Sequence, residues 1–139
     1  MTYPCYVNVG ALEQRYNWLS VVRKDDLCEV LAGSKTAEFT TRHIEPLVTM
    51  QFGCLVNHLL ALGEKEEKNF KLFKPQEKIR VIKQLLENNV HERYLVIGMI
   101  AGLFTQQELN YFTEHRIELC KQMVRVLVQK LKQESHLLF

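Results

Sequence analysis

The feature that most constrains the fold is a nearly continuous apolar segment in the first half of the chain. Residues 47–62 are mostly apolar, and Gly63 follows them. The segment is too long for a buried strand. Gln51, Asn57 and His58 make it too polar for a membrane span, and no apolar run reaches about 18 residues. Because a helix that is apolar around most of its circumference has to be enclosed by other elements, we expect 47–62 to be the central helix of an all-α domain.

The composition limits the classes of protein to which the chain can belong. Its 139 residues suit one domain, and 47% hydrophobic with 24% charged residues is the balance of a globular protein, not of a disordered chain. The formal net charge of +2 is too small to indicate a nucleic-acid-binding domain by itself. Four cysteines without a C-x-x-C pair, and a start that lacks the pattern of a signal peptide, predict free thiols and a cytoplasmic location.

Apolar periodicity divides the chain into about six helices. Apolar residues recur at intervals of three to four in each segment that we expect to be helical. These segments are 11–24, 27–31, 47–62, 75–87, 90–104 and 105–133. The stretch 34–45 fits either a helical turn or a loop, because its threonines favour helix caps over helix interiors. We predict a single domain over 1–139, a compact bundle of about six helices with a long C-terminal helix.

Residues typical of helix starts support three of these boundaries. Pro75 suits the first turn of a helix, where a missing N–H leaves no helical hydrogen bond unmade. Asn89 followed by Glu92, and Thr105 followed by Glu108, have the spacing of a capping box. Each pair predicts that a new helix begins directly after the asparagine or the threonine.

Two glycines lie four residues apart in the apolar helix expected at 90–104. Gly98 and Gly102 therefore share one face of that helix, and each costs close to 1 kcal/mol relative to alanine. Glycines spaced in this way allow another backbone to approach closely. We expect this face to pack tightly, either within the chain or against a second subunit.

The last helix carries an apolar seam that predicts a protein interface. Its members follow a three-four-three-four spacing, which is typical of helices that pack on a partner helix. They are Ile117, Cys120, Val124, Leu127 and Leu131. Two heptads are too few to indicate a coiled coil, so packing of the whole seam on the domain's own core is the alternative.

A lysine-rich segment between the central helix and the next one predicts a second kind of surface. Phenylalanines alternate with cations in it, a pattern that suits single-stranded nucleic acid because bases stack on aromatic faces. The candidate residues are Phe70, Lys71, Phe73, Lys74, Lys78, Arg80 and Lys83. Lys121, Arg125 and Lys132 share one face of the last helix and could extend this basic patch. Neighbouring glutamates dilute the positive charge, and a solvated linker is the alternative.

The sequence contains no recognisable catalytic or cofactor-binding motif. Cys54 and His58 are four residues apart and share a helix face, but a zinc site needs about four ligands and the remaining candidates are scattered. A nucleophilic cysteine would also need a concave site and an oxyanion donor. We therefore expect no metal, no cofactor and no enzymatic activity.

These observations together predict a small intracellular protein-interaction module, a regulator or adaptor that binds a protein partner or a second copy of itself. The two candidate interfaces are the seam on the last helix and the face of Gly98 and Gly102. The alternative is a nucleic-acid-binding regulator that uses the basic segment 71–83. A third hypothesis is peripheral attachment to a membrane surface through residues 70–74.

Overall fold

The computed structural model describes residues 36–137, and in this part of the chain all regular elements are helices. The helices expected at 11–24 and 27–31 lie outside the described residues. The α-helices are α3 (Thr36–Phe39), α4 (Glu45–Glu66), α5 (Pro75–Asn88), α6 (Val90–Ala101), α7 (Gln106–Glu114) and α8 (Arg116–Gln133). A π-helical turn, Thr40–Ile44, and two 3-10 turns, Phe70–Leu72 and Ser135–Leu137, complete the set. The all-α prediction is confirmed.

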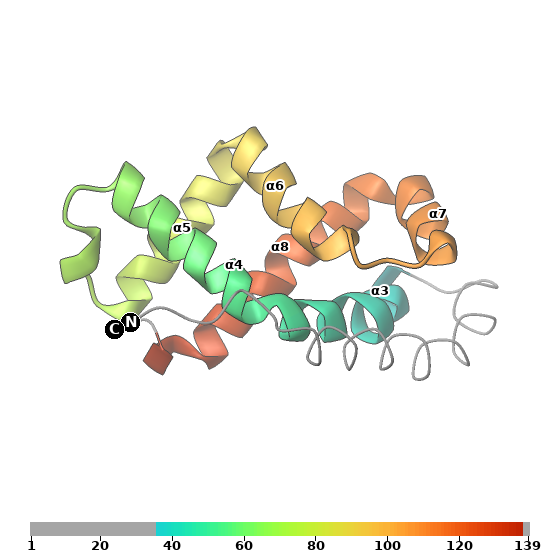
Figure 1. Ribbon diagram of the computed structural model, residues 1–139, viewed down its shortest axis with the longest axis horizontal. Coiled ribbons are helices and arrows are strands. Elements are labelled where there is room, and N and C mark those ends of the chain that lie inside the picture. Colours follow the sequence, from blue (N-terminus) through green and yellow to red (C-terminus); the bar gives the residue numbers. More distant parts are fainter. Residues whose placement is uncertain (1–35, 138–139) are drawn as a thin grey trace, which may run out of the picture.

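The helix α4 packs along one side on the other long helices of the bundle. It contacts α5, α6 and α8, and α8 in turn contacts α5, α6 and α7 (Figure 1). Most of the fully buried side chains of the core come from the four longest helices. They include Leu55 and Leu59 of α4, Ile82 and Leu86 of α5, Ile100 of α6, and Leu119, Met123 and Leu127 of α8. The elements α3 and α7 lie together at one end of the molecule (Figure 1).

The sequence of 34–45 fits either a helical turn or a loop. In the structure this stretch is helical from Thr36 onward and continues directly into α4. Pro46 has no N–H and its ring crowds the carbonyl one turn earlier, so a regular α-helical turn cannot precede it without strain. The chain widens to a π-helical turn there, in which the Glu45 N–H bonds to the Thr40 carbonyl. The hydroxyl groups of Thr40 and Thr41 bond to carbonyls four residues earlier, which satisfies them inside a helix.

The central helix differs from the expectation at its C-terminal end and on one face. It continues past Gly63 to Glu66, because Gly63 is a helical position that the ring of Phe70 covers, not a helix stop. Its core face is buried through Leu47, Leu55 and Leu59, while Ala61 is exposed. The enclosure of the segment is therefore incomplete among the described residues.

The continuous helix from Thr36 to Glu66 is long and apolar enough, by length and composition, to cross a membrane. This differs from the expectation drawn from residues 47–62, because the π-helical turn adds α3 to the helix. The core helix of a water-soluble protein meets the same two conditions. Here α4 contacts α5, α6 and α8, and 39% of the apolar window is buried inside the structure.

The helix starts that the sequence predicts are confirmed. Pro75 opens α5, and the Asn89 side chain accepts a hydrogen bond from the Glu92 N–H at 3.2 Å at the start of α6. Thr105 and Glu108 form a complete capping box at the start of α7, with each side chain bonded to the other residue's backbone N–H. Such caps satisfy N–H groups that have no partner within the helix.

The prediction of a single long helix over 105–133 is wrong, because the helix is interrupted at His115. The backbone of His115 leaves helical geometry, and its N–H divides between the carbonyls of Tyr111 and Phe112. The imidazole stacks on the Tyr111 ring at 4.3 Å between centroids and its Nδ1 lies 3.1 Å from the Tyr111 carbonyl oxygen. Two helices with different directions, α7 and α8, result.

Candidate functional site

The apolar seam of the last helix turns gradually from the surface into the core. Ile117 is 79% exposed, Val124 is half-buried and Leu131 is fully buried, although they are spaced seven residues apart. A straight α-helix rotates by about 20° per heptad relative to a seven-residue repeat. Over two heptads this rotation amounts to about 40°, so Ile117 and Leu131 do not lie on one line along α8.

The seam is therefore not one interface. Leu127 and Leu131 are fully buried in the domain's own core, so the prediction that they contact a partner is wrong. Ile117, Cys120 and Val124 remain at the surface, where they line a groove. The structure thus divides the predicted set into three groove residues and two core residues.

The groove lies between α5, α6 and α8 and has a volume of about 820 Å³. It is open to solvent, not enclosed. Its floor is mostly aliphatic, and its rim is mostly cationic. The lining residues are Lys83 and Glu87 of α5, Arg93 and Tyr94 of α6, and Arg116, Ile117, Cys120, Lys121, Val124, Arg125, Val128, Gln129 and Lys132 of α8.

Positive charge dominates the rim of the groove. Six of the lining residues are lysine or arginine, whereas Glu87 is the one carboxylate among them. None of the six cations forms an ion pair with another residue in the described range 36–137. A groove with low-polarity walls and charges of one sign concentrates its electrostatic field on ligands of the opposite sign.

Arg93 is held in position at the end of the groove by the backbone of α5. Its Nη1 donates to the Glu87 carbonyl at 3.0 Å, and its guanidinium lies 5.7 Å from the centroid of the Tyr94 ring. A cation beside the last carbonyls of a helix is stabilised by the helix dipole. Arg93 therefore presents its charge at a fixed place, unlike a free surface lysine.

The Cys120 thiol in the floor is predicted to react slowly. Burial raises its pKa above the ordinary value, and the charges of Arg116 and Arg93 only partly oppose this effect. Because the thiolate is the nucleophile, a raised pKa leaves less of the reactive form at neutral pH. We expect iodoacetamide, followed by peptide mass mapping between pH 7 and 10, to modify Cys120 more slowly in the folded than in the unfolded protein. A fast reaction of the folded protein near pH 7 would contradict this pKa direction.

The glycine face does not pack within the described residues as expected. Gly98 is exposed, and a Cβ built on it would meet nothing within 4 Å. A Cβ on Gly102 would meet only the Gly98 carbonyl oxygen, at 3.0 Å. Close intrachain packing of this face is therefore wrong for 36–137, and its use as a subunit interface stays a prediction.

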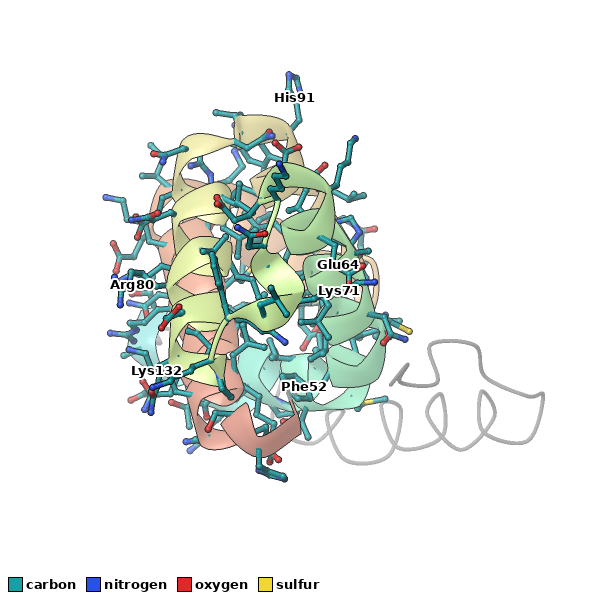
Figure 2. All side chains as sticks on the ribbon, turned by 90° about the vertical axis from the view of Figure 1, so that its left-hand side faces the viewer. Phe52, Glu64, Lys71, Arg80, His91 and Lys132 are labelled. Atoms are coloured by element: carbon teal, nitrogen blue, oxygen red, sulfur yellow. The ribbon has the colours of Figure 1, made fainter. Side chains whose placement is uncertain are left out.

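The basic segment is divided between different surroundings. Phe70 is 2% exposed, so it offers no free face to a base, and the mostly buried Lys78 places its ammonium 5.7 Å from the Phe70 ring centroid. The Lys71 ammonium lies 4.0 Å from a carboxylate oxygen of Glu64. In the view of Figure 2, Arg80 lies at the left edge of the molecule, away from Lys71. Phe73 is half-buried against Phe70, while Lys74 and Lys83 are exposed.

This arrangement corrects the proposed role of Phe70 as a stacking platform. Gly63 has no side chain, and the Phe70 ring fills the space beside it. The ring is therefore buried against α4. Of the seven candidate residues of the basic segment, Lys83 belongs to the groove. Lys83 of α5 shares this groove with Lys121, Arg125 and Lys132 of α8, whereas Arg80 is not among the lining residues.

Cys54 and His58 do not form a metal site with other described residues. No group of three or more His, Cys, Asp or Glu side chains could hold an ion in the described range. His58 instead contacts Glu92, with 3.0 Å between Nε2 and Oε2, and joins α4 to α6.

The sequence interpretation missed two kinds of residue. Arg93, Tyr94 and Arg116 complete the groove, and no pattern in the sequence distinguishes them from other surface residues of the predicted helices. His43 and Glu108 form a buried side-chain hydrogen bond, with 2.5 Å between Nδ1 and Oε2, across 65 residues of sequence. No local pattern brings such distant positions together.

The chain matches no family model, and comparison with curated proteins and with solved structures likewise found no match.

Proposed function

We propose that this protein is a small interaction module, a regulator or adaptor, which binds a protein partner in the groove between α5, α6 and α8. One observation carries this proposal. The groove joins exposed apolar side chains, led by Ile117 and Tyr94, to six cations that have no carboxylate partner in 36–137. An apolar centre within a polar rim is the usual composition of a protein interface.

The chemistry of the lining favours binding over catalysis. General acid–base catalysis needs a group whose pKa lies near the working pH. The groove offers one carboxylate, Glu87, and the Cys120 thiol, whose pKa is raised by burial. Its lining contains no histidine that could activate that thiol.

The charge of the groove argues for a partner other than a second copy of the chain. In a two-fold symmetric dimer, the same patch of both subunits meets itself. Pairing this groove with its own copy would place six cations near six others, and like charges across an interface weaken binding. Homodimerisation would have to use another surface, such as the exposed face of Gly98 and Gly102.

The proposal is tested by selecting helix-forming peptides from a display library on the full chain. We expect enriched peptides that bind the wild type and bind Ile117→Asp at least tenfold more weakly. Leu72→Asp is the matched control, because Leu72 is 84% exposed and lies outside the groove. Light scattering run alongside is expected to give the monomer mass of 16.4 kDa.

Two results would contradict the proposal. One is the absence of enriched peptides, and the other is binding that responds equally to Ile117→Asp and to Leu72→Asp. Retention of mixed-sequence single-stranded DNA that falls steeply with salt would instead support the nucleic-acid hypothesis, because phosphate contacts release counterions.

A further inference from the structure

We propose that the partner segment is an acidic amphipathic α-helix of about four turns, laid lengthwise along α8. This inference rests on the proposed function and specifies the chemistry of the partner. Three features of the groove carry it: its length, the arrangement of its apolar floor, and the distribution of its charges.

The length of the groove suits a short helix. Its lining runs along α8 from Arg116 to Lys132, a span of sixteen residue steps, which is about 24 Å at the rise of an α-helix. An open channel of this length accommodates a segment of similar length lying parallel or antiparallel to α8.

The floor has the spacing of a helix-packing surface. Ile117, Val124 and Val128 form a line with intervals of seven and four residues, and the half-buried Cys120 lies beside it. Grooves that receive amphipathic helices contact apolar anchors at i, i+3 or i+4, and i+7 of the partner. Aliphatic side chains with this spacing are complementary to leucine-like anchors.

The cations stand on both sides of this floor. Lys121, Arg125 and Lys132 form a stripe along α8, at intervals of four and seven residues, next to the apolar line. Lys83 of α5 and Arg93 of α6 belong to the facing wall. A helix with an apolar face flanked by glutamate or aspartate on both edges would meet a cation on either side.

The same lining is less suited to nucleic acid. Proteins that bind single strands stack successive bases on aromatic side chains. Tyr94 is the one aromatic residue in the lining, and the rest of the floor is aliphatic or a thiol. Aliphatic anchors contribute to a protein partner by burial of apolar area, a contribution that a phosphate backbone cannot match.

The experiment starts from the peptides enriched on the full chain. We expect them to carry apolar residues at helical spacing with acidic flanks. For the tightest peptide, replacing each acidic residue by its amide should weaken binding at least tenfold with the helix unchanged. Arg125→Glu and Lys121→Glu should each weaken binding of the acidic peptide by a similar factor, whereas Lys65→Glu, outside the groove, should not.

The outcomes separate this inference from the proposed function. Neutral or basic peptides that still depend on Ile117 would overturn the acidic helix and leave the interaction module standing. Failure to enrich any groove-dependent peptide would overturn both. Binding of mixed-sequence DNA that Arg125→Glu abolishes, without peptide binding, would likewise overturn both and assign the groove to nucleic acid. Circular dichroism and thermal melts of each variant exclude misfolding as the cause of a loss.

Discussion

Replacing Gly63 by alanine is expected to lower the free energy of unfolding by about 2 kcal/mol, although alanine normally stabilises a helix. A Cβ at this position would lie 2.4 Å from Cζ of Phe70, and the other near atoms belong to the same ring. Non-bonded carbon atoms need about 3.5 Å or more, so the ring must move. The measurement is urea denaturation followed by circular dichroism.

The ring of Phe70 has little room to move. It is 2% exposed, packs edge-on against Phe73 at 6.3 Å between centroids, and lies beneath the Lys78 ammonium. Pushing it outward would separate the Phe70–Leu72 turn from α4 and expose apolar surface. The cost of that exposure exceeds the gain of up to about 1 kcal/mol that alanine offers in a helix interior.

Gly98→Ala is the matched control, since it makes the same change in a helix where nothing lies within 4 Å of the new Cβ. It is expected to raise the free energy of unfolding by up to about 1 kcal/mol. A further check is the double variant Gly63→Ala with Phe70→Leu, whose loss should be smaller than the sum of the two single losses. Equal stabilisation by Gly63→Ala and Gly98→Ala would contradict the steric account.

Local patterns in the sequence were sufficient to predict most helix starts and the fold class. The caps at Asn89 and Thr105, and the proline at position 75, act within one turn of the chain, so neighbouring residues encode them. The π-helical turn before Pro46 escaped prediction. Its cause is also local, because the Pro46 ring crowds the carbonyl one helical turn earlier. That clash is relieved either by a π-helical turn or by the end of the helix, and the sequence does not indicate which of the two occurs.

The groove could be predicted only in part, because it depends on how helices cross. Ile117, Cys120 and Val124 were found through their spacing, but the rotation of α8 that buries Leu131 depends on where α8 meets the core. Arg93 enters the groove from α6, and no periodicity in α6 indicates which helix it will face. The positions of the helices were thus easier to predict from the sequence than the contacts between them, and the site depends on those contacts.

Glu108→Ala is expected to lower the free energy of unfolding by about 3 kcal/mol, since it removes the buried hydrogen bond to Nδ1 of His43, at a cost of roughly 1–3 kcal/mol, and also removes half of the α7 cap, at a cost of about 1 kcal/mol. Glu108 and His43 are both fully buried. One carboxylate oxygen accepts from the Thr105 N–H at 2.8 Å, while the other lies 2.5 Å from Nδ1 of His43. The side chain thus caps α7 and binds it to the π-helical turn.

Two further variants divide these roles. Thr105→Ala removes the other half of the capping box and is expected to cost only about 1 kcal/mol. Glu108→Gln keeps an acceptor for the Thr105 N–H but replaces the carboxyl group facing Nδ1 of His43 by an amide, so its loss should fall between those of Thr105→Ala and Glu108→Ala. If Glu108→Ala cost no more than Thr105→Ala, the hydrogen bond to His43 would contribute nothing measurable.

The location of the pair predicts where the structure would open first. His43 stacks on Phe39 at 4.9 Å, and Phe39 stacks on Tyr111 of α7 at 4.5 Å, so the hydrogen bond lies beside the aromatic contacts that join the two segments. Loss of the carboxylate removes the polar part of this junction and leaves the rings. Hydrogen exchange of Glu108→Gln should therefore accelerate in α7 and in Thr40–Ile44 before it does in α5 or α8, because regions open separately when their own contacts weaken. Uniform acceleration over all helices would show instead that the pair stabilises the bundle as a whole.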